Sequence, residues 1–175
     1  MHPWHETRDA RSPDNIEPTA ARRAVIQAAA GGFVLMAFTG CSSTAPKATS
    51  VSGNVVAATD LNPSVTQRPS PLLLRIYELK SAAAFNQADF MALYQGDAAA
   101  LGAEMVAREE LTVQPGESRP LNKPLSADTR FIGVFAAYRD VNKARWRAVL
   151  PVQAGKAQKL TIRADALAVS IQAVP

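Results

Sequence analysis

Apolar and polar residues alternate along much of the chain after residue 50, and this alternation predicts short β-strands. Every second residue of a strand faces the same side, so each such segment has one face to bury. The segment 131–138 is apolar on both faces, which is typical of a central strand. We predict strands at 51–57, 72–77, 106–113, 131–138, 145–150, 159–163 and 167–173.

Short strands separated by turn signals predict a mainly β fold, a β-sandwich of two antiparallel sheets. One turn signal is 115–116, a Pro-Gly pair in which glycine suits a position with positive φ. In the strand at 145–150, Trp146 shares one face with Ala148 and Leu150. We therefore expect Trp146 to pack in the core.

The stretch from 82 to 101 is rich in alanine and breaks the alternation. Phe90, Leu93 and Tyr94 have the spacing of residues on one face of a helix. We predict a short helical insertion here, made of two helices, with these three side chains facing the core.

Polar residues near this insertion suggest where its helices begin and end. Asn86 is a candidate cap for the first helix, with Asp89 in its first turn and Gly96 at its end. Asp97 is a candidate cap for the second helix.

The segment 60–71, between the first two predicted strands, carries three prolines and no long apolar run. Proline fixes φ and removes a backbone donor, so this segment is predicted to be a stiffened loop. A rigid loop loses less entropy when it docks on a partner, which favours a recognition role. The alternative is that the loop only bridges the two sheets, and the residue pattern leaves both interpretations open.

An uncharged, mainly apolar run of 17 residues, 24–40, precedes the only cysteine, Cys41. The run follows Arg22 and Arg23, and it is short for a membrane-spanning helix, which needs about 20 apolar residues. Basic residues, an apolar run and small residues before a cysteine are typical of a bacterial lipoprotein signal. We expect cleavage between Gly40 and Cys41 and a lipid on Cys41; an uncleaved anchor or a buried cysteine are the alternatives.

The polar leader before this run leaves the export route open. It carries charges of both signs, which is unusual for an ordinary signal. Translation from a later start is one interpretation. A twin-arginine signal at 21–26 is another. The predicted organisation is a signal peptide at 1–40, a flexible lipid-attached tether at 41–50 and a β-sandwich domain at 51–175.

The predicted mature chain has few groups that could carry chemistry. His2 and His5 both lie in the predicted signal, so histidine-dependent hydrolysis and zinc binding are disfavoured. The net charge is +4, without a basic run, which gives nucleic-acid binding little support. We expect no enzyme activity, no metal, no small-molecule substrate and no cofactor apart from the covalent lipid on Cys41.

Several of these residues, in this order, resemble the TssJ (SciN, VasD) family of type VI secretion outer-membrane lipoproteins. The resemblance covers most of 51–152. Its residues are the cysteine at the end of the signal, 61–63, 68–71, 72–79, Phe85, 88–90, Leu93, Val134, 137–139 and Trp146.

This resemblance implies a transthyretin-like β-sandwich and a non-catalytic role at the periplasmic face of the outer membrane. Proteins of this family bind the periplasmic domain of TssM and help to build a trans-envelope complex that also contains TssL. Ser42, after the cysteine, resembles the residue that permits sorting to the outer membrane. The loop between the first two strands would contact TssM, and we select Asn62, Pro63, Val65, Gln67 and Arg68 as its binding residues.

Two other functions fit the same residues. The chain could serve as a periplasmic chaperone or pilot lipoprotein for another envelope assembly. It could also bind a small molecule or a glycan between its sheets, although Trp146 fits the core better than a glycan site.

Overall fold

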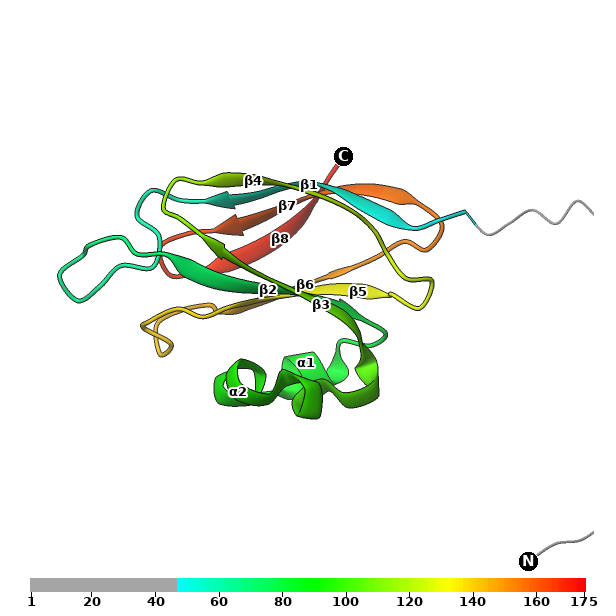
Figure 1. Ribbon diagram of the computed structural model, residues 1–175, viewed down its shortest axis with the longest axis horizontal. Coiled ribbons are helices and arrows are strands. Elements are labelled where there is room, and N and C mark those ends of the chain that lie inside the picture. Colours follow the sequence, from blue (N-terminus) through cyan, green and yellow to red (C-terminus); the bar gives the residue numbers. More distant parts are fainter. Residues whose placement is uncertain (1–46) are drawn as a thin grey trace, which may run out of the picture. The chain divides into compact units, whose positions relative to one another are not determined.

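Two four-stranded sheets stack face to face in the computed structural model, which describes residues 47–175 (Figure 1). The predicted sites Gly40, Cys41 and Ser42 lie outside the described residues. The first sheet has the order β4 (Ser118–Pro124), β1 (Ser50–Ala57), β7 (Ala157–Ala164) and β8 (Val169–Val174). The second has the order β3 (Met105–Val113), β2 (Leu72–Leu79), β5 (Phe131–Ala136) and β6 (Arg147–Pro151). The predicted β-sandwich is confirmed.

The pairing of β1 with β7 departs from the prediction of two antiparallel sheets. These strands run parallel, so the first sheet is mixed, whereas every pair in the second sheet is antiparallel. Gly53 has φ +145° at the centre of this pairing, and a Cβ there would overlap the carbonyl oxygen of Leu160. Glycine at this position therefore lets the two strands approach each other.

The main core lies between the sheets and follows the predicted alternation. Leu74 and Ile76 of β2 face this core, and Leu160 and Ile162 of β7 face it from the opposite sheet. The central strand β5 is buried on both faces, as its sequence predicts. Trp146 is partly buried and packs against this core, which confirms its assignment as a packing residue.

The edge strand β4 was not among the predicted strands. It contains Pro120 and Pro124, and Leu121 is its one buried residue. An edge strand tolerates proline because one side of its backbone has no strand to pair with. With two prolines and a single apolar position that faces the core, β4 lacks the signal by which strands are recognised.

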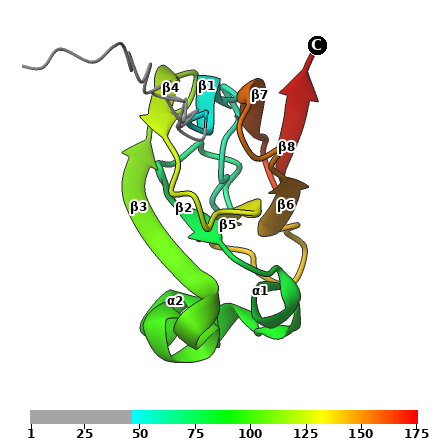
Figure 2. The ribbon, with the colours of Figure 1, turned by 90° about the vertical axis from the view of Figure 1, so that its right-hand side faces the viewer.

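Two helices cover the outer face of the second sheet, as Figures 1 and 2 show: α1 (Ala83–Gln87) and α2 (Phe90–Leu101). A short 3₁₀ helix, η1 (Gly102–Glu104), leads into β3. This layer forms a second core, in which Phe85 and Leu93 of the helices pack on Tyr77 and Phe135 of the sheet. Of the three side chains predicted to face the core, Phe90 and Leu93 do so, whereas Tyr94 is 45% exposed and faces it only in part.

The helix ends differ from the predicted ones. Asp89, and not Asn86, is the N-cap of α2, and its side chain accepts a 2.7 Å hydrogen bond from the backbone NH of Ala92. Asn86 lies inside α1. Gly96 has non-helical backbone angles and forms a kink within α2, and Asp97 is buried after it. The contacts of Asp97 with the sheet, described below, account for the burial of its side chain.

No helix within residues 47–175 is long and apolar enough to cross a membrane.

Candidate partner-binding site

The β1–β2 loop, residues 58–71, projects from the end of the sandwich opposite to Lys47, the first described residue (Figure 1). Backbone hydrogen bonds close it into a narrow finger. The NH of Ser70 donates to the carbonyl of Leu61 at 2.9 Å, and the NH of Ser64 donates to the carbonyl of Arg68 at 2.9 Å. The predicted stiff loop is therefore held by hydrogen bonds as well as by its prolines.

Asn62 anchors the base of this loop. It is only 3% exposed, and its backbone has φ 46°, a conformation that asparagine tolerates better than most residues. Its Nδ2 donates to the carbonyl of Pro71, and its Oδ1 accepts from the backbone NH of Arg139, both at 2.9 Å. Its own NH donates to the carbonyl of Ala166 at 3.1 Å. One buried residue thus ties the β1–β2, β5–β6 and β7–β8 connections together.

Tyr138 makes a second link between these connections. Its side chain is buried, and its hydroxyl donates to the carbonyl of Asp165 at 3.0 Å. Burial, together with the nearby charge of Asp165, raises the pKa of Tyr138, so the phenol stays protonated and remains a donor. The β5–β6 and β7–β8 connections are therefore pinned to each other independently of Asn62.

The tip of the loop is the exposed part. Val65 is fully exposed, at 100%. A hollow of about 530 Å³ lies beside it, between the loop and its two neighbours. The hollow is lined by Pro63, Ser64, Val65, Gln67, Arg139, Asp140, Lys143 and Leu167.

The surface around this hollow carries more positive than negative charge. Arg68 and Arg139 are exposed, while Lys143 is paired with Asp140 at 3.2 Å. No described acidic side chain pairs with Arg68 or Arg139. The arrangement presents the apolar side chain of Val65 beside two guanidinium groups that have no acidic partner among residues 47–175, which suits a protein surface of complementary shape and charge.

The structure places the five predicted binding residues in different roles. Pro63, Val65 and Gln67 line the hollow, and Arg68 is exposed on the same loop. Asn62 is buried with its amide group engaged inside the chain, where it holds the base of the loop in position.

Ser64 of the same loop also lines the hollow and was not among the predicted residues, and four lining residues outside the loop were missed: Arg139, Asp140, Lys143 and Leu167. They belong to loops far away in the chain, and nothing in their local sequence indicates that these loops meet the β1–β2 loop. The one feature of the sequence that could have drawn attention to them was the polar segment after the central strand β5.

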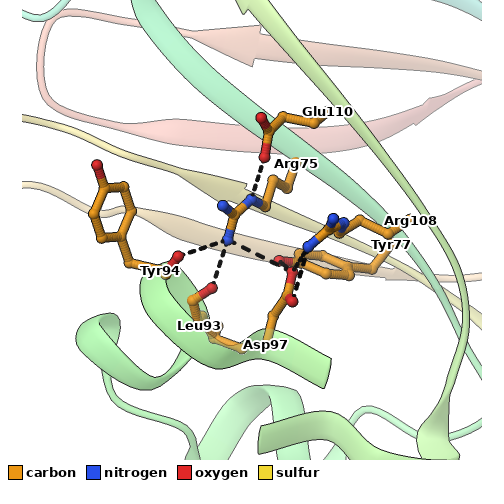
Figure 3. A network of polar contacts seen from close by, with 7 residues as sticks. All are labelled: Arg75, Tyr77, Leu93, Tyr94, Asp97, Arg108 and Glu110. Atoms are coloured by element: carbon orange, nitrogen blue, oxygen red, sulfur yellow. Dashed lines mark hydrogen bonds and ion pairs between the residues drawn. The ribbon is translucent and has the colours of Figure 1, made fainter. Parts of the chain in front are cut away.

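Besides the loop and its hollow, charged side chains also gather in a polar network between α2 and the second sheet, which Figure 3 shows. Nη1 of Arg75 donates to the carbonyls of Leu93 (2.7 Å) and Tyr94 (3.0 Å), and its Nε donates to Glu110 (2.7 Å). These carbonyls lie just before the kink at Gly96, where the backbone angles are not helical. Arg75 therefore caps the first half of α2 from the sheet.

Asp97 completes this network. It accepts from the hydroxyl of Tyr77 at 2.8 Å and from Nη1 of Arg108 at 2.7 Å. Burial alone would raise the pKa of Asp97, but the hydrogen bonds from Arg108 and Tyr77 and the positive charges hold it below its usual value. All of these groups are satisfied by one another, so the network fastens α2 to the sheet and offers no unoccupied base or nucleophile.

Glu78, the other buried carboxylate, is also satisfied internally. It accepts from the hydroxyl of Thr129 at 2.7 Å and from the NH of Ser126 at 3.0 Å, and it pairs with Lys123 at 3.0 Å. No group of three histidine, cysteine, aspartate or glutamate side chains in the described part of the chain is arranged to bind a metal ion.

A family model described as "Type VI secretion lipoprotein, VasD, EvfM, TssJ" matches residues 49–167, more than half of the chain. The matched segment contains the whole β1–β2 loop and all residues that line the hollow. No functionally curated protein matches the sequence.

Solved structures agree with this family. The chain is 41% identical to the T6SS lipoprotein TssJ1 from Pseudomonas aeruginosa, with a TM-score of 0.71 over 73% of this chain and 98% of that one. It is 27% identical to a chain of a type VI membrane complex, with a TM-score of 0.61 and the same coverage. It is 26% identical to a chain in a structure described as the T6SS protein TssM C-terminal domain from EAEC, with a TM-score of 0.57 over 73% and 98% of the two chains.

The family model describes type VI secretion lipoproteins, and the 41% identical structure is also a T6SS lipoprotein. The fold, the family model and the 41% identity to a T6SS lipoprotein lead to one assignment. The chain belongs to the type VI secretion lipoprotein family that includes VasD and TssJ.

Proposed function

We propose that this protein is an outer-membrane lipoprotein that binds the periplasmic domain of TssM and helps to assemble the type VI secretion membrane complex, which also contains TssL. Its similarity to chains of a type VI membrane complex and of a TssM C-terminal domain structure supports this proposal. The observation that carries it is the finger-like loop at 58–71, rigid at its base and apolar at its exposed tip.

The membrane anchor in this proposal is a lipid on Cys41, added after cleavage at Gly40, with Ser42 as the residue that permits outer-membrane sorting. Burial of an acyl chain contributes about 0.8 kcal/mol per CH₂, so several chains anchor a protein stably where one does so marginally. Because the anchor is covalent, the folded domain needs no membrane-spanning helix to stay at the membrane.

The loop is suited to recognition because little of its freedom is left to lose. Asn62 and the backbone bond between Ser70 and Leu61 fix its base before any partner arrives. Ordering a flexible loop costs binding free energy, so a loop that is already ordered binds more tightly for the same contacts. Val65 and Pro63 then supply apolar contact at the tip and beside the hollow.

The charges beside the tip predict the character of the partner surface. Arg68 and Arg139 are exposed without an acidic partner among the described residues, and arginine is well suited to bidentate pairing with carboxylates. We expect acidic side chains on the TssM face that meets the hollow. Such complementary charges accelerate association and fix its orientation more than they strengthen it.

Anchoring and recognition act together in this mechanism. A lipid that confines the domain to the membrane raises its effective concentration near a partner in the same envelope. A moderate affinity between the separate domains is then sufficient for assembly.

The test replaces 64–68, the tip of the loop, with a glycine–serine segment of equal length, while Asn62 and Ser70 remain to hold the base. We expect loss of binding to the TssM periplasmic domain, measured by calorimetry, with the thermal midpoint of unfolding little changed. Met91→Ser is the matched control, because Met91 is an exposed apolar residue on α2, remote from the loop. Unchanged affinity of the loop variant would place the interface elsewhere.

A further inference from the structure

The end of the sandwich opposite to the β1–β2 loop carries a group of exposed basic side chains. Lys47, the first described residue, enters β1 at this end, and Lys156 and Lys159 lie at the start of β7 beside it. Arg130 is exposed in the β4–β5 connection, whose backbone bonds with Leu79 and Val152 place it at the same end. We call this region the tether end and define it by Lys47, Arg130, Lys156 and Lys159.

Backbone contacts hold the tether end together. The NH of Gly155 donates to Oγ1 of Thr49 at 2.8 Å, and the NH of Ser50 donates to the carbonyl of Lys156 at 3.2 Å. A Cβ on Gly155 would lie 3.6 Å from the carbonyl oxygen of Lys47, so the entering chain packs directly on the β6–β7 turn. The basic side chains are thus carried by a defined surface.

A shallow hollow of about 550 Å³ lies on this surface. Lys156 and Lys159 border it, and none of the residues that line it is acidic. Exposed apolar atoms of Val174 lie in the same hollow. A site with ammonium groups around an open apolar floor suits an anionic, amphipathic partner.

These positive charges are not neutralised by the described part of the domain. Lys47, Arg130, Lys156 and Lys159 have no ion pair among residues 47–175. Asp128, the acidic side chain of the β4–β5 connection, is already paired with Lys80 at 3.3 Å. The tether end therefore keeps a net positive charge.

Covalent geometry keeps this charge close to the anchoring membrane. Lys47 follows Cys41 by six residues, and six residues span at most about 20 Å when fully extended. The electrostatic attraction of an anionic lipid surface acts over about 8–10 Å at physiological salt. A lipid on Cys41 therefore keeps Lys47 within about 20 Å of the headgroups, so a modest bend of the intervening chain brings the tether end within range of their charge.

We propose that the tether end docks on anionic lipid headgroups, with Lys47, Lys156, Lys159 and Arg130 contacting the phosphate groups; this inference rests on the lipid anchor of the proposed function. Each basic side chain near an anionic membrane surface strengthens attraction roughly fivefold. Docking orients the sandwich with its long direction away from the membrane. The β1–β2 loop, at the other end of the domain, then points away from the membrane, towards a partner in the periplasm.

The experiment uses the full lipidated protein reconstituted in vesicles. Acylation blocks Cys41, the only cysteine, so Ala154→Cys gives one free thiol, in the β6–β7 turn at the tether end. A fluorophore on this thiol reports contact with the bilayer through quenching by spin-labelled lipids. Val65→Cys gives the same probe at the far end of the domain. The vesicles contain phosphatidylcholine alone or with one third phosphatidylglycerol.

We expect strong quenching of the Ala154→Cys probe on vesicles with phosphatidylglycerol, weak quenching on neutral vesicles, and little quenching of the Val65→Cys probe on either. The triple variant Lys47→Gln, Lys156→Gln, Lys159→Gln should lower the ratio of docked to undocked protein roughly tenfold or more. Added salt should act in the same direction because it screens the attraction. The control variant Arg119→Gln, Arg145→Gln, Arg163→Gln removes the same charge from exposed arginines near the loop end and should leave the quenching unchanged.

Three outcomes would contradict the inference in distinguishable ways. If the protein attaches to the vesicles but its quenching depends neither on phosphatidylglycerol nor on the three lysines, the docking is contradicted and the lipid anchor is not. Protein that does not attach to vesicles at all would overturn the lipid anchor and the docking with it. If the lysine variant lost TssM binding while its quenching stayed normal, the tether end would be a protein interface and the lipid assignment would be wrong.

Discussion

At the scale of single residues, two buried polar side chains determine how the surface features are presented. Asn62 joins three loops through both ends of its amide and its backbone NH. Asp97 joins α2 to the sheet through Tyr77 and Arg108. Neither residue offers a free group to a ligand, and the importance of each comes from the number of segments that it connects.

Asn62→Ala is expected to destabilise the domain by about 2–3 kcal/mol, because it leaves the carbonyl of Pro71 and the NH of Arg139 without partners. The φ of 46° adds strain for alanine. Urea unfolding measures this loss. Thr66→Ala, at the exposed tip of the same loop, is the control and should change the free energy of unfolding by less than about 0.5 kcal/mol. Equal effects of the two variants would contradict the anchoring role of Asn62.

Asp97 predicts how stability depends on pH. Its pKa in the folded state lies below the usual value of about 4, so the unfolded chain binds more protons in this range. The stability that Asp97 contributes is therefore present above pH 4 and is lost as the pH falls towards its folded pKa. The same direction holds for Glu78, whose pKa is lowered by hydrogen bonds from Ser126 and Thr129 and by Lys123, against the effect of its burial.

Asp97→Asn tests this dependence. At pH 7 we expect the variant to be about 2–4 kcal/mol less stable, because Arg108 and Arg75 lose a buried charged partner. At pH 3 the difference should shrink. Urea titrations at the two pH values measure it, with the more exposed Glu110→Gln as control. A difference that stays constant between the two pH values would show that folding does not lower the pKa of Asp97.

At the scale of elements, long-range contacts determine where strands and helices begin, end and pair. Arg75 caps the first half of α2, and Nη1 of Arg147 donates to the carbonyls of Phe85 (3.0 Å) and Ala88 (2.7 Å) at the end of α1. Both arginines project from strands of the second sheet, so the sheet stabilises helices that are too short to be stable alone. The parallel pairing of β1 with β7 is likewise a contact between distant segments.

Gly53→Ala is expected to disrupt this parallel pairing. Its Cβ would overlap the carbonyl oxygen of Leu160, a backbone atom that cannot move without separating the two strands. We expect a loss of at least about 3 kcal/mol or failure to fold, measured by thermal unfolding and by hydrogen exchange of β1 and β7. Gly96→Ala makes the same chemical change where no atom lies within 4 Å and should cost at most about 1 kcal/mol. If Gly53→Ala destabilised the domain as little as Gly96→Ala, the inferred close approach of β1 and β7 would be contradicted.

At the scale of the whole molecule, the sandwich separates two surfaces along its long direction. The β1–β2 loop and its hollow lie at one end, and the tether end lies at the other (Figure 1). A partner that binds at the loop end does not have to displace the membrane from the tether end. In the proposed function, the domain would act as a spacer that sets the distance between the lipid anchor and the recognition surface.

Cys41→Ser is expected to remove the protein from the outer membrane and to abolish secretion, because the lipid cannot be added. Cys41 lies outside the described sandwich, residues 47–175, so the free energy of unfolding should change by less than about 0.5 kcal/mol. Membrane fractionation and urea unfolding measure the two effects. Ser43→Ala is the control and should fractionate like the unaltered protein. Persistence of the Cys41→Ser variant in the outer-membrane fraction would contradict the anchor.

The strands could be predicted from the sequence wherever alternating residues have a face to bury. The segments around Ile76, Val134 and Ile162 are examples, because each buried side chain has polar or differently facing neighbours at fixed spacing. The strand β4 could not be predicted, since its single buried residue, Leu121, makes no pattern. Within the candidate site, the loop and its exposed residues were accessible from proline content, whereas Arg139 and Lys143 were not.

The local sequence pattern by itself predicts the two-layer β architecture, the helical insertion and the stiffness of the β1–β2 loop. These properties depend on residues a few positions apart, whose spacing sets which face is buried and which φ is allowed. The parallel β1–β7 pairing, the buried roles of Asn62 and Asp97 and the meeting of three loops around one hollow arise only in the folded molecule. Each of them depends on hydrogen bonds or contacts between segments that are distant in sequence, and such contacts leave no periodic trace in either segment alone.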